Sequence, residues 1–177
     1  MVQISTADKI KKNFDAQEQG FQKYFVLLKE LLEKISSPEP ALAYCFQRIE
    51  FAQRNGLYAL LMREYRTDSD LSWQVVDRLD VTRISGKRLP SNLKLIIQPA
   101  ESVRDDITHG RTKSKAEINK AILNCIEYAE ALNAAFNNQV GFKPIGDLRG
   151  VTSKRGKPQL DKKISRVVLK GLGFLLS

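Results

Sequence analysis

The chain has 177 residues, of which 42% are hydrophobic, so it can form one domain with a core and is too apolar for general disorder. No apolar run approaches the roughly 20 residues of a membrane span, and the first residues lack the apolar core of a signal peptide. The net charge is +9, and residues 140–177 hold nine basic and two acidic side chains, which contribute +7. This distribution fits either a polyanion partner such as RNA or a tail that aids solubility or docks on its own domain.

These features predict a cytoplasmic protein without a membrane partner. Cys45 and Cys125 both lie in helical pattern and are expected to be free thiols in the core. No cysteines and histidines have the spacing of metal ligands, so neither a metal nor another cofactor is expected.

Two long helices are predicted at the start of the chain. Apolar residues in the range 5–35 recur at steps of three, four and seven, which predicts one helix that ends at the prolines of residues 36–40. A second helix is expected over residues 40–66. Its Asn55-Gly56 pair indicates either a break into two helices or a point where another backbone packs closely.

The middle of the chain has mixed patterns. Residues 67–70 are typical of an N-terminal cap, and a short helix is expected after them, whereas residues 84–90 are predicted to form a basic loop. A third main helix is expected from Ser91 to about Thr108, with either a kink or a restart at Pro99.

The fourth main helix is the clearest. Ser114 and Glu117 have the spacing of a capping box, and an apolar face continues from there to Phe136. The predicted helix ends near residues 137–138. Because nothing in residues 1–139 requires a strand, we expect this part to be an all-α, up-and-down bundle of four main helices with short extra helices.

Residues 140–177 are predicted to form a basic C-terminal extension of the bundle. Residues 140–160 are rich in glycine, proline and basic residues, and we expect a loop that either wraps the bundle or follows a phosphate backbone. From Asp161 a short amphipathic helix is expected to dock on the bundle or across a subunit interface. Its predicted apolar face consists of Ile164, Val167, Val168, Leu172 and Leu175.

Residues 104–110, Arg-Asp-Asp-Ile-Thr-His-Gly, hold the only histidine of the chain, His109. Histidine can take and give a proton near neutral pH, and arginine presents a forked cationic group that suits phosphate. Arg104 and His109 at a helix end therefore suggest phosphodiester chemistry. The alternative is a surface histidine that is stabilised by the dipole of the helix C-terminus.

This motif, placed between the last two helices of the bundle, resembles the HEPN family of small α-helical domains, many of which are ribonucleases. Many of these ribonucleases carry an arginine, then a polar residue, and a histidine four to six positions after the arginine, which here are Arg104, Asp105 and His109. Asparagine is commoner than aspartate after that arginine. Position 111 is an arginine and not the tyrosine that an antitoxin modifies in one HEPN toxin group, so that form of control is not expected.

The resemblance implies a metal-independent endoribonuclease in which the ribose 2′-hydroxyl attacks, leaving a 2′,3′-cyclic phosphate and a 5′-hydroxyl. His109 would move a proton, Arg104 would hold the phosphate, and Asp105 would orient one of the two by hydrogen bonding. An acid and a base on opposite sides of a phosphate normally need two groups, and the chain has one histidine. We therefore expect a homodimer with a composite site on its twofold axis, as the resemblance also implies.

RNA is the expected substrate, and a toxin or phage-defence effector of this kind would have an antitoxin or regulatory protein as a further partner. Three basic clusters are predicted to contact RNA: Lys87 and Arg88; Arg111, Lys113 and Lys115; and Lys154, Arg155 and Lys157. Two alternatives stay open. One is a non-catalytic RNA-binding or protein-interaction bundle, and the other is the inhibitory partner of a larger toxin.

Overall fold

The computed structural model describes residues 6–77, 91–146, 159–174 and 176. All regular structure within these ranges is helical, which confirms the predicted all-α class. None of the described helices is long and apolar enough to cross a membrane. The helices are α1 (Thr6–Asp15), α2 (Gln19–Tyr24), α3 (Leu28–Lys34), α4 (Glu39–Arg63), α5 (Ser69–Asp77), α7 (Ser91–Thr108), α8 (Lys115–Val140) and α9 (Lys162–Gly171).

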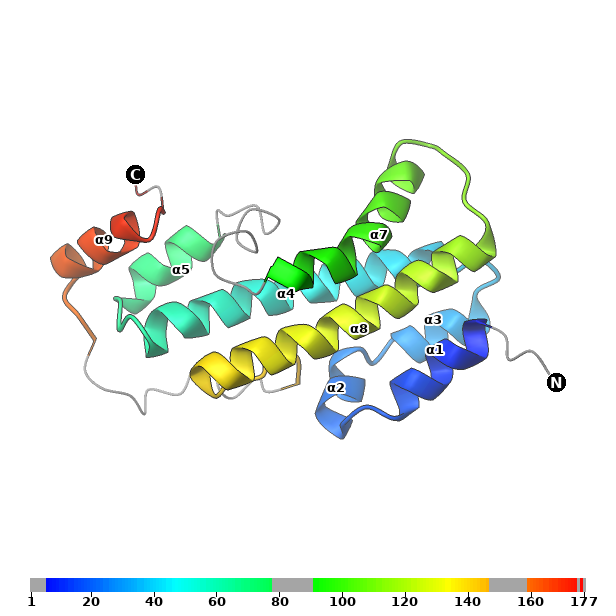
Figure 1. Cartoon of the computed structure of the whole chain (residues 1–177), viewed down its shortest axis with the longest axis horizontal. Helices are drawn as coiled ribbons and strands as arrows, with labels where there is room; N and C mark the ends of the chain where they lie inside the picture. Colours follow the sequence, from blue (N-terminus) through cyan, green and yellow to red (C-terminus); the bar gives the residue numbers. More distant parts are fainter. Residues whose placement is uncertain (1–5, 78–90, 147–158, 175, 177) are drawn as a thin grey trace.

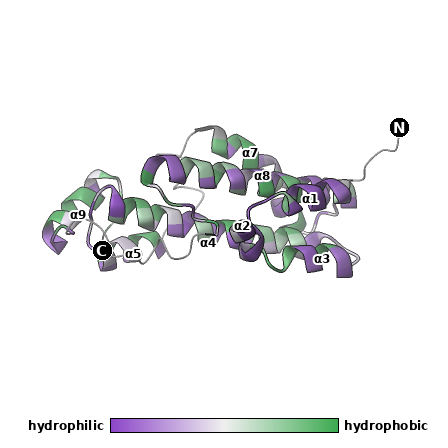
Figure 2. Cartoon of the chain, turned by 90° about the horizontal axis from the view of Figure 1, so that it is seen from below, coloured by the Kyte–Doolittle hydropathy of each residue, from purple (hydrophilic) through white to green (hydrophobic). Residues whose placement is uncertain are grey.

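The long helices α4 and α8 lie side by side and form the axis of an elongated molecule (Figure 1). α8 also packs on α7 and α1, and α4 also packs on α3 and α5. The largest fully buried side chains come mostly from these two helices and from the short N-terminal ones. In Figure 2 hydrophilic and hydrophobic bands alternate along α3 and α9, as is typical of amphipathic helices that bury one face.

The first predicted helix is wrong, because this part of the chain forms three short helices. The Gln22 side chain satisfies carbonyls where α1 ends, since its Nε2 donates to the oxygens of Asp15 at 3.1 Å and Gln17 at 2.9 Å. Gly20 lies against the segment that follows α8, where an added Cβ would be 3.3 Å from the Gly146 carbonyl oxygen. The two breaks let one cluster of large side chains reach the core: Phe21, Tyr24, Phe25 and Leu28.

α4 continues without a break through Asn55 and Gly56. The ring of Phe136 on α8 lies directly over Gly56, and a Cβ added there would be 2.7 Å from a ring atom. Close packing therefore explains the glycine, although its neighbour is an aromatic side chain and not the backbone that the sequence suggested.

The predicted features around α5 and α7 have different outcomes. Asp68 begins α5 as predicted, because its Oδ1 accepts a hydrogen bond from the Leu71 amide at 3.1 Å. α7 has Pro99 in its interior, so the helix does not restart there. Figure 1 shows that α7 changes direction part-way along its length, as a proline kink would produce. The predicted basic loop at residues 84–90 lies outside the described residues.

α8 begins with the predicted capping box. The Glu117 amide donates to Ser114 Oγ at 3.2 Å, and the Ser114 amide donates to Glu117 Oε2 at 2.9 Å. The helix is slightly longer than expected. Its last residue is Val140, and the C-cap Gly141 has a φ of 62°, in the left-handed region. The chain then turns back, and Phe142 and Ile145 are buried.

α9 packs on α5, but its predicted apolar face is wrong in part. Ser165 and Leu169 are the buried residues, whereas Ile164 is 48% exposed and Val167 is 70% exposed. The reason is a hydrogen bond of 2.8 Å from the Asp68 amide to Ser165 Oγ, which fixes the rotation of α9 about its own axis. Val168 and Leu172 are half-buried, as expected for that face, and Leu175 lies outside the described residues.

Candidate functional site

The Arg-Asp-Asp-Ile-Thr-His-Gly motif occupies the C-terminal end of α7. Gly110 adopts a left-handed φ of 76°, and its amide donates to the Ile107 carbonyl at 2.9 Å. The Arg111 amide donates to the Asp106 carbonyl at 2.8 Å. These two bonds form a Schellman motif, in which glycine takes the left-handed position with little steric cost. The direction in which His109 leaves the helix is therefore fixed by the backbone.

His109 is exposed at this helix end. Its backbone amide donates to the Asp105 carbonyl at 2.9 Å, so the two residues are one helical turn apart. Residues four apart on a helix lie on the same face, which places the imidazole beyond the Asp105 carboxylate. The ring is therefore accessible from solvent.

Arg104 is held from two sides. Its Nη2 and Nε donate to Oδ1 of Asp105 at 2.8 Å and 3.1 Å. Its guanidinium carbon lies 4.6 Å from the ring centroid of Phe46 on α4. The side chain is 40% exposed, so the charged end is ordered by these contacts and still open to a ligand.

Asp105 links Arg104 to the face that carries His109. Five positions along an α-helix correspond to about 140° around its axis, so Arg104 and His109 start on different sides of α7. The Arg104 side chain bends toward Asp105, which does lie on the histidine face. Asp105 is therefore the residue that connects the Arg104 guanidinium to the side of α7 on which His109 leaves the helix.

The connection between α7 and α8 is held by a second carboxylate, Asp106. It accepts from Arg111 Nη1 and Lys113 Nζ, both at 2.7 Å, and Lys113 also lies 3.6 Å from Glu117. Hydrogen bonds from Lys113 and Arg111 lower the pKa of Asp106 below its ordinary value. Two of the three predicted RNA contacts in this cluster thus already have acidic partners, whereas Lys115 is exposed at the first position of α8.

Glu101 is a further charged group near the motif that the sequence analysis did not identify. It precedes Arg104 by three positions and is half-buried. Burial raises the pKa of its carboxyl group, and the positive charge of Arg104 partly opposes this shift. The spacing of three positions between Glu101 and Arg104, which brings two side chains together on a helix, could have indicated this contact in the sequence. Phe46 was also missed as a site residue, because an aromatic residue within the apolar pattern of α4 looks like any other core residue.

The predicted RNA contacts Lys87, Arg88, Lys154, Arg155 and Lys157 lie outside the described residues. Residues 104–117 contain four basic and three acidic side chains, so the surroundings of His109 have a net charge of only +1. Among the described residues no group of three or more histidine, cysteine, aspartate or glutamate side chains is arranged to hold a metal ion.

Comparison of the chain with models of protein families, with curated proteins and with solved structures gave no match. The function is therefore inferred from the residues of α7 and their neighbours.

Proposed function

We propose that the chain is a metal-independent endoribonuclease of the HEPN type, with Arg104, Asp105 and His109 as its site. The observation that carries the proposal is an exposed imidazole one helical turn from a carboxylate that holds an ordered arginine. This arrangement places a group that can transfer a proton near a group that can bind phosphate.

The proposed reaction needs only groups of this kind. The ribose 2′-oxygen attacks the adjacent phosphorus, the bond from phosphorus to the 5′-oxygen breaks, and a 2′,3′-cyclic phosphate and a 5′-hydroxyl result. One His109 accepts the proton of the 2′-hydroxyl, and a second His109, in protonated form, gives a proton to the leaving oxygen. Arg104 stabilises the charge that develops on the phosphoryl oxygens.

The pair between Arg104 and Asp105 does not prevent phosphate binding. Both side chains are substantially exposed, and exposed ion pairs contribute only about 0–1 kcal/mol. A phosphate can therefore take up the remaining donors of the guanidinium or displace the carboxylate. Asp105 then serves as a positioning residue that keeps Arg104 turned toward the face of His109.

The second histidine comes from a second copy of the chain in this proposal. α7 has an exposed stripe that begins at Leu95, which is 70% exposed, and ends at His109. Its members recur at helical spacing: Leu95, Gln98, Ser102, Asp105 and His109. Side-by-side packing of two such stripes, about a twofold axis that runs along α7, would cover Leu95 and bring both copies of the motif to one cleft.

The direct test is incubation of the purified protein with total RNA in EDTA, followed by end-group analysis of the fragments. We expect cyclic-phosphate ends from the wild type, a loss of about 100-fold or more in His109→Ala, and a clear loss in Arg104→Lys, which keeps the charge but not the fork. Thr112→Ala, an exposed change in the same connection, is the control and should cleave normally. Equal cleavage by the wild type and His109→Ala would contradict the proposal.

A non-catalytic RNA-binding or interaction module is the second candidate. It is favoured by the contacts of Arg104 with Asp105 and Phe46, which would also suit a purely structural arginine. In that case the wild type and His109→Ala would bind RNA equally and neither would cleave it.

A further inference from the structure

α9 is attached to the bundle by one face only. Ser165 Oγ accepts from the Asp68 amide at 2.8 Å and donates to the Leu160 carbonyl at 3.3 Å. Leu169 is fully buried. Just before the helix, the Leu160 amide donates to the Arg66 carbonyl at 2.8 Å. These contacts fix which side chains of α9 point outward.

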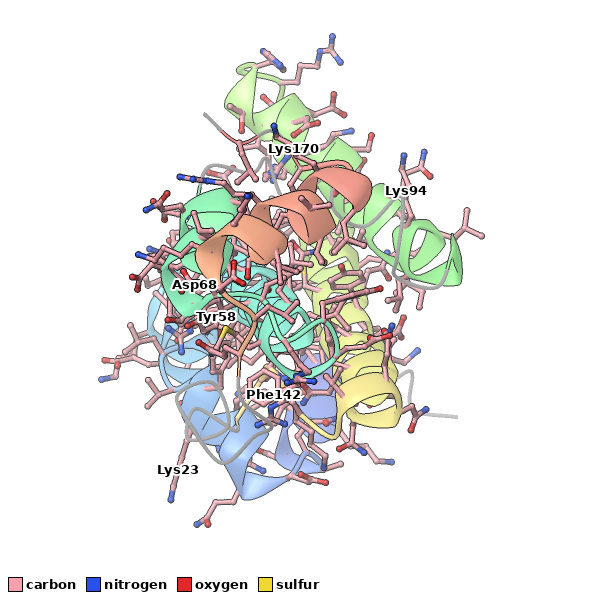
Figure 3. The ribbon with its side chains drawn as sticks, turned by 90° about the vertical axis from the view of Figure 1, so that its left-hand side faces the viewer. Lys23, Tyr58, Asp68, Lys94, Phe142 and Lys170 are labelled. Carbon is pink, nitrogen blue, oxygen red and sulfur yellow. The ribbon has the colours of Figure 1, made fainter. Side chains whose placement is uncertain are left out.

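The outward face of α9 is basic. Lys163, Arg166 and Lys170 are all exposed, and their spacing of three and four positions places them on successive turns of one face. They span about 10 Å along the axis at 1.5 Å per residue. Within the described ranges none of the three pairs with a carboxylate, and α9 itself contains no acidic residue. Figure 3 looks at this end of the molecule and labels Lys170 on α9.

We infer that this face of Lys163, Arg166 and Lys170, termed here the α9 basic face, binds the phosphate backbone of single-stranded RNA. It would act as an anchor for the substrate of the α7 site, so the inference rests on the proposed function. The two surfaces differ in charge. The surroundings of His109 have a net charge of only +1, which gives little attraction for a polyanion, whereas residues 161–171 hold four basic residues and one acidic residue, Asp161, a net charge of +3.

α9 is poorly suited to bind an anionic lipid surface. A membrane-bound amphipathic helix inserts its whole apolar face, but Leu169 of α9 is fully buried and Val168 and Leu172 are half-buried in the protein. Only Ile164 and Val167 remain exposed, without an aromatic residue in the helix. Binding of a phosphate backbone requires only cations at suitable spacing, which the α9 basic face has.

The α9 basic face and the α7 site lie far apart in one chain. Figure 1 shows α9 at one end of the long axis, whereas the connection from α7 to α8 lies toward the other end. A very short RNA could therefore occupy only one of the two. The anchor should increase the affinity for long RNA and have little effect on an RNA that is just long enough for the α7 site.

The test compares two triple variants in a His109→Ala background, so that the RNA stays intact. One is Lys163→Gln, Arg166→Gln and Lys170→Gln, and glutamine has a helix propensity close to that of lysine and arginine. The matched control changes three exposed lysines of α1 and α2, away from α9 (Figure 1). These are Lys9→Gln, Lys12→Gln and Lys23→Gln. Circular dichroism of both proteins verifies that the helices are retained.

Affinities for long and short single-stranded RNAs of the same composition are measured over a salt series. We expect the α9 variant to bind long RNA more weakly. Its plot of log K against log salt should be less steep than that of the wild type by about 2, since each lost phosphate contact removes about 0.7 from the slope. The control variant should keep its slope. Equal losses in both variants would mean general attraction and would overturn the inference, as would an unchanged slope in the α9 variant. α9-dependent binding to phosphatidylserine vesicles with unchanged RNA affinity would assign the face to lipid.

These outcomes do not depend on catalysis. If the wild type fails to cleave RNA but the α9 variant loses RNA affinity, the proposed ribonuclease is wrong and RNA binding by the α9 basic face stands. If the wild type cleaves RNA and the α9 variant binds it normally, the ribonuclease stands and the anchor is wrong.

Discussion

The guanidinium of Arg104 lies over the aromatic ring of Phe46, with its carbon 4.6 Å from the ring centroid. The ring belongs to α4 and the arginine to α7, so the contact fixes the arginine from a helix outside its own motif. A cation held over a ring face keeps its hydrogen-bonding edge free, and such a contact contributes about 0.5–1 kcal/mol at exposed sites. Arg104 is thereby ordered before any phosphate binds.

Replacement of the Phe46 ring should therefore reduce cleavage at the α7 site. We expect Phe46→Leu to lower kcat/KM for a defined RNA by about 2- to 5-fold, the equivalent of the lost cation–π contact. Phe46→Tyr keeps the ring and is the matched control, with nearly normal cleavage. A Phe46→Leu protein as active as Phe46→Tyr would show that the ring does not position Arg104.

Asp105→Asn should separate binding from catalysis. The change removes a negative charge beside the site, so RNA affinity should rise slightly at low salt. The cleavage rate at saturating RNA should fall, because the amide holds Arg104 less firmly than a carboxylate. The free energy of unfolding should change by no more than about 0.5 kcal/mol, since the ion pair between Arg104 and Asp105 is exposed. Single-turnover kinetics over a range of RNA concentrations measure the affinity and the cleavage rate, and thermal unfolding measures the stability. An increased cleavage rate would contradict the positioning role of Asp105.

The sequence alone predicted features that depend on neighbours in the chain. The capping box of Ser114 and Glu117 lies within four residues, and it formed as expected. Arg104, Asp105 and His109 lie within six residues, so their relation to one helix end could also be predicted. Whether they catalyse a reaction stays a prediction.

Contacts between distant segments explain what the sequence could not predict. The close approach of α2 to the segment beyond α8 depends on Gly20 and Gly146, which are far apart in the sequence. The outward direction of Val167 depends on the bond between Ser165 and Asp68. Periodicity predicts that a helix has an apolar face, but such partners determine where it ends and which residues it buries.

Gly56→Ala tests the close contact of α4 with α8. An added Cβ would lie 2.7 Å from the Phe136 ring, so the helices must move apart or the ring must change its rotamer. We expect a loss of about 1–3 kcal/mol in the free energy of unfolding by urea. Gly171→Ala, at the end of α9 with nothing within 4 Å of the added Cβ, should be neutral or stabilising by up to about 1 kcal/mol. Equal effects would contradict this packing.

Asp106 should make the α7–α8 connection sensitive to acid. Hydrogen bonds from Lys113, which has the larger effect, and from Arg111 lower the pKa of its carboxyl group below the ordinary value of 3.8. A carboxylate with a lowered pKa in the folded state stabilises the protein above its unfolded pKa. That stabilisation is lost as the pH falls below 3.8 and through the folded pKa. Thermal unfolding from neutral to acid pH should therefore show a smaller decrease of Tm in Asp106→Asn than in the wild type. Thr112→Ala, an exposed and uncharged position in the same connection, should keep the wild-type pH dependence.

Ser165→Ala should loosen α9 without changing any residue of its basic face. The Asp68 amide would lose its hydrogen-bond acceptor in a partly buried place, which costs about 1–3 kcal/mol. Hydrogen exchange should become faster in α9 and at the start of α5, and remain unchanged in α8. The affinity for long RNA should fall in parallel if α9 must be docked to act as an anchor. Ser36→Ala, an exposed serine between α3 and α4, is the control and should alter neither measurement. Unchanged exchange in α9 would contradict the role of Ser165 in holding this helix on α5.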